Sequence, residues 1–267
     1  MKNALLSIAL FTMTPVTVIG CQNDGAGIES VPAVALTSER TMDVQASGKL
    51  GAYALFDGAK DSGTASWDLY LRSLHQDDRR YLEDISDRYF GTVHFSGAED
   101  REALLRLGFP LPEEWLAAKG MSEAELRAMS DRGDHKAEIF LVDRLLAKMA
   151  AVTAQAGAEN YLEVVKALPE AARPSVDKDR LEVLNRSADV FSEGPTPFAA
   201  YQYGVAFSAA TGSPEPIPAA MAMAAELGDR RAETLMADYE ARSPAGNQKL
   251  VSQLHATMRK MAKRPAP

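Results

Sequence analysis

Residues 134–157 read DHKAEIFLVDRLLAKMAAVTAQAG, and this stretch decides the fold class. Its large apolar residues recur every three or four positions, the spacing that places side chains on one face of an α-helix. Asp134 is a preferred residue for capping a helix start, and Gly157 is a preferred residue just after a helix end. The stretch therefore predicts a long, partly buried helix. The apolar face is expected to consist of Ile139, Phe140, Leu141, Leu145, Leu146 and Met149.

Similar helix signals continue on both sides of this stretch, from Trp67 to the C-terminal end. Ser122 with Glu125 matches a capping box, and Thr196 followed by Pro197 is a second start signal. No alternating strand pattern, Asn-Gly hairpin or βαβ unit is present. Residues 66–267 are therefore expected to form an all-α domain of about nine or ten short helices joined by Gly and Pro turns.

Two weaker signals are also used to place helix starts. Ser96 and Ser175 are expected to cap the helices that follow them. Residues 92–95 are expected to form a short extended link.

A six-residue pattern occurs twice in the predicted helical region. Residues 133–138 read GDHKAE and residues 228–233 read GDRRAE, so four of six residues are identical. The 95-residue offset fits about three periods of a helical repeat of thirty-odd residues. The alternative is that Gly-Asp is a common pair between any two helices, in which Gly ends one helix and Asp caps the next.

Residues 199–207, AAYQYGVAF, and 224–229, AAELGD, followed by Ala232, resemble one Sel-one-like repeat, a relative of the tetratricopeptide repeat. The chain departs from that pattern where Tyr203 replaces the usual Leu, and the usual aromatic of the second helix is missing. The match is best over 197–240 and weaker over 130–155. The resemblance implies a helical-hairpin stack, an α-solenoid, with a repeat-like region at about 130–242, and a role in binding proteins.

The N-terminal residues match a secretory signal. Lys2 precedes an apolar run over residues 4–19, and Gly20 stands before Cys21. The sequence VIGC at 18–21 resembles the lipobox of bacterial lipoproteins. The alternative is an ordinary signal peptide with a chance cysteine.

The lipobox resemblance implies cleavage after residues 1–20 and attachment of a diacylglycerol to Cys21. It also implies acylation of the new amino terminus, for example with palmitate. Two or three acyl chains would anchor the protein stably in a membrane. Gln22, in the place where Asp favours inner-membrane retention, points to the outer membrane and a periplasm-facing domain. Residues 21–65 are rich in Gly, Ala, Ser, Thr and Asp and are expected to form a flexible, disordered tether.

The composition fits a soluble helical domain. Hydrophobic residues make up 46% of the chain, charged residues 25% and aromatic residues only 7%. The net charge is −8, and removal of residues 1–20 would leave −9. An acidic surface argues against nucleic-acid binding and suits solubility or a basic partner. Cys21 is the only cysteine, so the chain has neither an internal disulfide nor a cysteine-based metal site.

No residue pattern identifies an active site, and no catalytic, metal or cofactor-binding residue is predicted. The histidines lack the spacing of a zinc motif. His135 and His255 are expected on the surface. Ser-x-x-Lys at 175–178 lacks the partner motifs of penicillin-binding proteins. The paired carboxylates are ordinary in an acidic protein. The residues considered for a site and not assigned to one are His75, His94, His135, His255, Ser175 with Lys178, Asp77 with Asp78, and Glu113 with Glu114.

Two surface features leave alternatives open. The aromatic series Tyr201, Tyr203, Phe207 and Tyr239 is expected to pack inside the helix stack, or to line a groove for a partner. The basic run at 259–264 is expected to neutralise the last helix carbonyls. Contact with lipid headgroups or an acidic partner is the alternative.

These features together favour an envelope-anchored lipoprotein that binds a protein partner as a helical-repeat scaffold. An immunity, inhibitor or assembly protein is the concrete version, by analogy with some envelope proteins. The alternatives are an enzyme that acts on peptidoglycan without a recognisable motif and a purely structural envelope protein.

Overall fold

The computed structural model describes residues 66–242 and 247–263, and every regular element in these ranges is an α-helix. The predicted all-α fold, with neighbouring helices packed on one another, is therefore confirmed. The signal sequence, Cys21 and the predicted tether lie outside the described residues. The twelve helices are α2 (Trp67–Ser73), α3 (Gln76–Arg88), α4 (Ala98–Arg106), α5 (Pro112–Lys119), α6 (Glu123–Ser130), α7 (His135–Ala156), α8 (Tyr161–Ala167), α9 (Arg173–Glu193), α10 (Pro197–Thr211), α11 (Pro216–Glu226), α12 (Ala232–Arg242) and α13 (Gln248–Ala262).

The helix count exceeds the nine or ten expected. The helices beyond those expected are α11 and α12, which follow Gly212. At α11, two prolines in the first turn suit a helix start because they need no partner for a missing N–H group.

The strongest cap predictions are confirmed. The Asp134 carboxylate accepts the Ala137 N–H at 3.0 Å, and Gly157 ends α7 with a φ of 63°. Ser122 and Glu125 form the predicted capping box at α6. The Asp134 and Ser122 caps satisfy N–H groups that have no partner inside the helix.

The two Gly-Asp copies build the same turn. Gly133 and Gly228 both have a positive φ, 88° and 106°. In each copy the Gly N–H donates to the carbonyl three residues back and the Asp N–H to the carbonyl five residues back, at 2.8 to 3.1 Å. This pair of bonds is the Schellman motif, which favours glycine because the left-handed backbone crowds a Cβ.

Three of the weaker local predictions are wrong. Gly97, and not Ser96, is the N-cap of α4, since Ser96 instead donates to the Asp100 carboxylate through its N–H (2.8 Å) and its hydroxyl (3.2 Å). Ser175 is the third residue of α9, because Pro174 extends the helix start back to Arg173. Residues 91–93 form a turn, so the expected extended link at 92–95 is limited to its last two residues.

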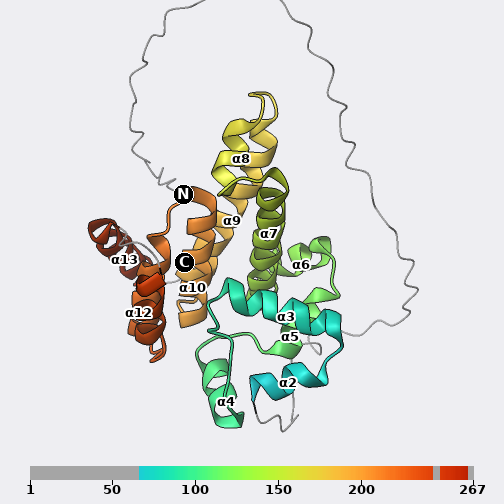
Figure 1. The fold of residues 1–267 in the computed structure, drawn as a ribbon, viewed down its shortest axis with the longest axis vertical. Coiled ribbons are helices and arrows are strands. Elements are labelled where there is room, and N and C mark those ends of the chain that lie inside the picture. Colours follow the sequence, from blue (N-terminus) through green and yellow to red (C-terminus); the bar gives the residue numbers. More distant parts are fainter. Residues whose placement is uncertain (1–65, 243–246, 264–267) are drawn as a thin grey trace, which may run out of the picture. The chain divides into compact units, whose positions relative to one another are not determined.

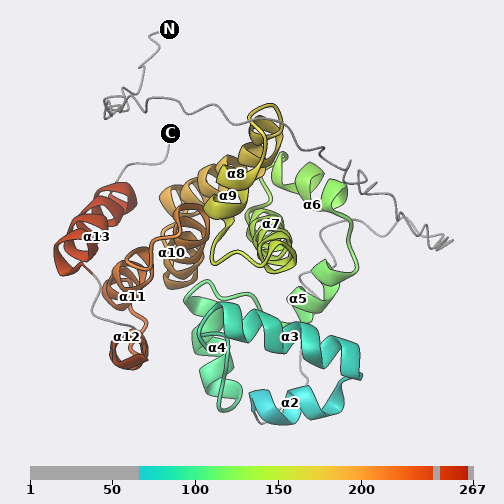
Figure 2. The same cartoon turned by 45° about the horizontal axis from the view of Figure 1, so that its top comes forward.

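Helices α7, α9 and α10 lie at the centre of the described domain. α10 packs most extensively on α11 and α9, while α7 packs on α6 and α9 (Figures 1 and 2). The α10–α11 approach requires Gly204. A Cβ there would clash with the Ala220 side chain and lie 2.9 Å from the Pro216 carbonyl oxygen.

Aromatic rings fill the junction between the N-terminal helices and α10. Trp115 packs edge-on against Phe140 at 4.9 Å between ring centres. Phe198 contacts both Tyr89 (5.0 Å) and Phe109 (5.3 Å). These side chains are almost fully buried, so they join helices far apart in sequence into one core.

The predicted aromatic series packs within the domain. Tyr201 is 1% exposed. Tyr203 stacks on an aromatic ring of α9 and meets Phe207 edge-on at 5.9 Å. Tyr239 packs edge-on against Phe90. The packing interpretation fits these contacts.

The C-terminal helix α13 packs on α11 and α9 through an apolar face whose Met258 is buried. The Arg259 guanidinium donates to the Glu226 carboxylate of α11, with its Nε at 2.8 Å. This basic side chain therefore pairs with a neighbouring helix rather than with the last carbonyls of its own helix.

Candidate functional site

The four histidines are spread over separate parts of the described domain. His75 caps α3, and its ring nitrogen Nδ1 accepts the Asp77 N–H. His135 begins α7, and His255 lies 3.2 Å from the Glu226 carboxylate. His135 and His255 are half-buried, so the expected surface placement holds only in part. Within residues 66–242 and 247–263, no group of three or more His, Cys, Asp or Glu residues is arranged to hold a metal ion.

His94 takes part in a serine–histidine contact. Its Nε2 atom lies 2.6 Å from the Ser86 hydroxyl, and its ring stacks on Trp67 at 4.9 Å. Burial lowers the pKa of His94. Ser86 is only 6% exposed, and a nucleophile must reach its substrate. The pair therefore serves to hold the turn after α3 against α2.

The paired carboxylates found in the sequence support helix starts. Asp77 and Asp78 lie in the first turn of α3, and Asp78 pairs with Lys119 at 2.7 Å. Glu113 and Glu114 lie in the first turn of α5. Acidic residues in these places stabilise the positive end of the helix dipole.

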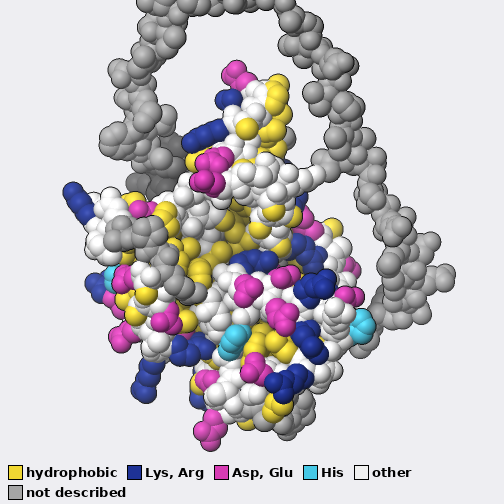
Figure 3. Space-filling view, in the orientation of Figure 1, with side chains coloured by type: hydrophobic (Ala, Val, Ile, Leu, Met, Phe, Trp, Pro, Cys, Tyr) yellow, Lys and Arg dark blue, Asp and Glu magenta, His cyan; other side chains and the backbone are white. Residues whose placement is uncertain are grey.

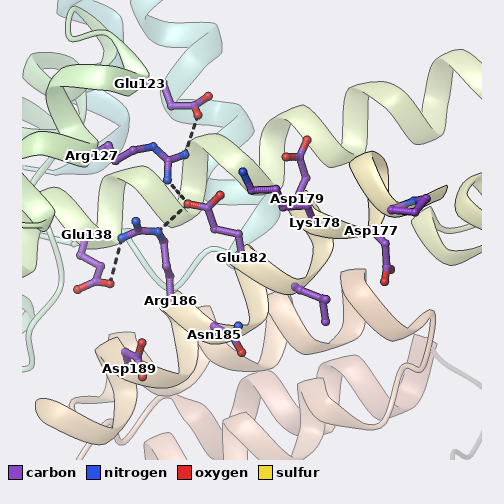
Figure 4. Close-up of a pocket in the computed structure, with 12 residues that line it drawn as sticks. Glu123, Arg127, Glu138, Asp177, Lys178, Asp179, Glu182, Asn185, Arg186 and Asp189 are labelled. Carbon is purple, nitrogen blue, oxygen red and sulfur yellow. Dashed lines mark hydrogen bonds and ion pairs between the residues drawn. The ribbon is translucent and has the colours of Figure 1, made fainter. Parts of the chain in front are cut away.

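An open concavity lies along α9, between α9 and the neighbouring α6 and α7 (Figure 4). It has a volume of about 1080 Å³. We call it the α9 groove. Its lining residues are Glu123, Arg127, Glu138, Pro174, Asp177, Lys178, Asp179, Leu181, Glu182, Asn185, Arg186 and Asp189.

Alternating charges cross the α9 groove as a ladder of ion pairs (Figure 4). Glu123 pairs with Arg127 at 2.9 Å, and Arg127 also contacts Glu182. Glu182 pairs with Arg186 at 2.8 Å, and Arg186 reaches Glu138 at 3.6 Å. The ladder joins α6, α9 and α7, so it fixes the positions of the charges.

The pKa shifts show which carboxylates of the groove are fully compensated by arginines and which are not. Burial alone would raise the pKa of Glu182, but hydrogen bonds from Arg127 and Arg186 outweigh it and lower the pKa. Burial raises the pKa of Glu138, and Arg186 only partly opposes it. Burial and the nearby Glu193 raise the pKa of Asp189. Neighbouring carboxylates add to these increases, so negative charge is in excess around Glu138 and Asp189.

A smaller hollow of about 490 Å³ continues the α9 groove at this end and shares Glu138 and Asp189 with it. Asp131 and Glu193 line it as well, and His135 lies among these carboxylates. We call Asp131, Glu138, Asp189 and Glu193 the acidic end of the groove. The hollow also includes Gly133, so the first Gly-Asp turn forms part of its wall.

A third concavity, of about 640 Å³, lies between α7, α8 and α10. Its lining is mainly small and apolar, with Leu146, Met149 and Tyr161 as its largest apolar side chains. Among its lining residues only Glu159 and Tyr161 can ionise.

The chemistry of the α9 groove suits recognition. Most of its titratable side chains are held in ion pairs, and the groove is open and polar (Figure 4). Acidic and basic side chains are also interspersed over the face in Figure 3. An open groove with fixed charges can orient a complementary polypeptide. The i, i+4 pairings of Glu182 with Arg186 and of Glu123 with Arg127 were signals in the sequence that could have pointed to this surface.

Lys178, from the Ser-x-x-Lys match, lines the α9 groove. The groove was not predicted, because its walls come from three helices whose packing the sequence does not reveal.

Comparisons with known proteins found no match among protein-family models, curated proteins or solved structures. Among the described helices, none combines the length and the apolar character required to cross a lipid bilayer.

Proposed function

We propose that this protein is a bacterial envelope lipoprotein whose helical domain binds a protein partner through the α9 groove. The observation that carries the proposal is the groove itself, an open concavity of about 1080 Å³ lined by charges in fixed positions. Fixed, complementary charges give specificity and fast association in protein–protein recognition. Inhibition of a toxin, immunity or assembly are the roles in which such a scaffold would act.

The lipobox-like VIGC at 18–21 supports the location. Acylated Cys21 would hold the domain at a membrane, and Gln22 favours the outer membrane with the domain facing the periplasm. The helical domain would then meet envelope or secreted proteins.

The anchor is tested by replacing its one reactive side chain. Cells that express the full chain or its Cys21→Ser variant are labelled with an alkyne analogue of palmitate and fractionated. The wild type is expected to carry the label in the membrane fraction and the variant to lose the label, because a serine cannot form the thioether. An unlabelled wild-type protein would show an ordinary signal peptide instead.

The groove is tested by filling it. The chain from Gln22, which keeps every described helix, is used to capture envelope and secreted proteins of its own cell. Asn185→Trp places a bulky ring in the α9 groove from an exposed position. Gln253→Trp adds the same ring to the exposed face of α13 and serves as the matched control.

We expect one stoichiometric partner to be retained by the wild type and by Gln253→Trp and to be lost by Asn185→Trp. A partner retained by all three proteins would place the binding surface elsewhere. The absence of any partner at several salt concentrations would contradict the scaffold role.

A further inference from the structure

The exposed face of α9 carries one continuous row of side chains. Asp177, Leu181, Asn185, Asp189 and Glu193 follow each other at intervals of four residues, which places them along one ridge of the helix. The first four line the α9 groove, and the last lines the hollow that continues it. The row spans sixteen residues, about 24 Å at 1.5 Å per residue.

Leu181 is the apolar member of this row. It is 45% exposed, and it is one of only three large hydrophobic side chains that are exposed within the described residues. It lies among the charged side chains of a concave surface. An apolar side chain of a ligand that covers Leu181 would remove both from water, which favours binding.

The far end of the row is short of positive charge. In the part of the chain that the structure describes, Asp189 and Glu193 have no Lys or Arg nitrogen within 4 Å. Arg186, the cation on this part of α9, is already shared by Glu182, Glu138 and Asp131, at 2.8, 3.6 and 3.5 Å. A further cation would therefore find carboxylate oxygens that are free to accept hydrogen bonds.

Building on the proposed function, we propose that the α9 groove binds a basic segment of the partner protein. The segment packs one apolar side chain on Leu181 and places arginine or lysine side chains beside Asp189 and Glu193. The charge complementarity of the acidic end selects a cationic segment, and Leu181 selects its register.

The geometry also fixes the spacing within the segment. Asp189 and Glu193 lie eight and twelve residues beyond Leu181, which corresponds to about 12 Å and 18 Å along the helix. A helical partner would place its basic residues about eight and twelve residues from its apolar residue. An extended partner would need about four and six residues, at 3.3 Å per residue, because alternate side chains of an extended segment share a face.

The test uses a labelled helical peptide of Ala and Gln that carries one leucine, with arginines eight and twelve residues after it. Its binding to the chain from Gln22 is measured by fluorescence anisotropy at low and raised salt. Asp189→Asn with Glu193→Gln neutralises the acidic end. Glu83→Gln with Asp87→Asn is the matched control, an exposed acidic pair with the same four-residue spacing on α3.

We expect the Asp189/Glu193 variant to weaken binding about tenfold at low salt and to lose most of the salt dependence, because two exposed ion pairs are removed. The control pair is expected to change binding less than twofold. Leu181→Ala is expected to weaken binding about threefold to fivefold at both salt concentrations, because the loss is apolar. A peptide with glutamates in place of the arginines is expected not to bind.

Equal losses in the α9 and α3 variants, or no measurable binding of the arginine peptide, would overturn this inference. The proposed function fails by a different result. A cellular partner that is lost with Asn185→Trp but unaffected by Asp189→Asn with Glu193→Gln keeps the scaffold role and removes the basic-segment inference. Peptide binding that depends on the groove, without any cellular partner, would keep the basic-segment inference and remove the scaffold role.

Discussion

The two Gly-Asp turns have similar sequences and the same backbone conformation, yet the side chains of their aspartates make different contacts. Asp134 caps α7 through the Ala137 N–H and is half-buried. Asp229 is 1% exposed, accepts the Tyr201 hydroxyl at 3.1 Å and pairs with Arg231 at 2.9 Å. A local pattern thus specifies a turn, while the surrounding helices decide what its side chain does.

A chemical counterpart of Asp229 lies outside the two Gly-Asp turns. Asp143, in the middle of α7, is also buried at 3% exposure. It accepts the Tyr89 hydroxyl at 3.0 Å and pairs with Arg88 at 2.5 Å. Burial raises the pKa of Asp143, and Arg88 opposes that effect. In both clusters a buried Asp binds a Tyr hydroxyl and an Arg, and only the Asp229 cluster belongs to a Gly-Asp turn.

The Asp229 cluster also connects distant segments. Arg231 donates to the His94 carbonyl oxygen at 3.2 Å, and its guanidinium lies 5.2 Å from the centre of the Phe109 ring. The second turn thus holds the N-terminal helices against the C-terminal ones, whereas the Asp134 side chain of the first turn bonds to the start of its own helix.

The largest contrast is expected from Asp229→Ala and Asp134→Ala. Asp229→Ala leaves Arg231 and the Tyr201 hydroxyl without their acceptor, and we expect it to lower the free energy of unfolding by about 3 kcal/mol. Asp134→Ala removes one cap and is expected to cost about 1 kcal/mol. Urea unfolding followed by circular dichroism measures both. Equal losses would mean that the two turns are equivalent after all.

A smaller contrast is expected from the two glycines. Gly228→Ala forces an alanine to a φ of 106°, and Gly133→Ala forces one to a φ of 88°. A Cβ at residue 133 would have no neighbour within 4 Å. We expect losses of about 2 kcal/mol and about 1 kcal/mol, because the strain grows as φ leaves the left-handed helical region. Thermal unfolding of the two variants checks the order. A larger loss for Gly133→Ala would show that backbone strain at these φ values does not set the order.

The sequence predicts a structural feature well when that feature depends only on neighbouring residues in the chain. Asp134, Ser122 and Thr196 were assigned correctly because a cap needs only the residues that follow it. The prediction that Ser96 caps α4 is wrong because Ser96 donates its hydrogen bonds to the Asp100 carboxylate. The helix therefore begins at Ala98, one residue later than it would with Ser96 as its N-cap. The choice between these two arrangements depends on the surrounding packing.

The candidate site required information of longer range. The row on α9 is visible as i, i+4 spacing, but the sequence does not show which face of a helix stays exposed. That choice depends on α6 and α7, which lie beside α9 and close the groove. The anchor at Cys21 rests on a pattern of four residues and stays a prediction.

The smallest contrast separates the Tyr201 hydroxyl from the rest of its cluster. Tyr201→Phe removes one donor from Asp229 but leaves Arg231 in place, so we expect a loss of about 1 kcal/mol in the free energy of unfolding. Tyr203→Phe, on the same helix, keeps the ring that stacks in the core and is expected to change it by less than about 0.5 kcal/mol. Urea unfolding of both variants gives the comparison. If Tyr201→Phe were as neutral as Tyr203→Phe, Arg231 alone would satisfy Asp229, and the difference between the two Gly-Asp turns would rest on one ion pair.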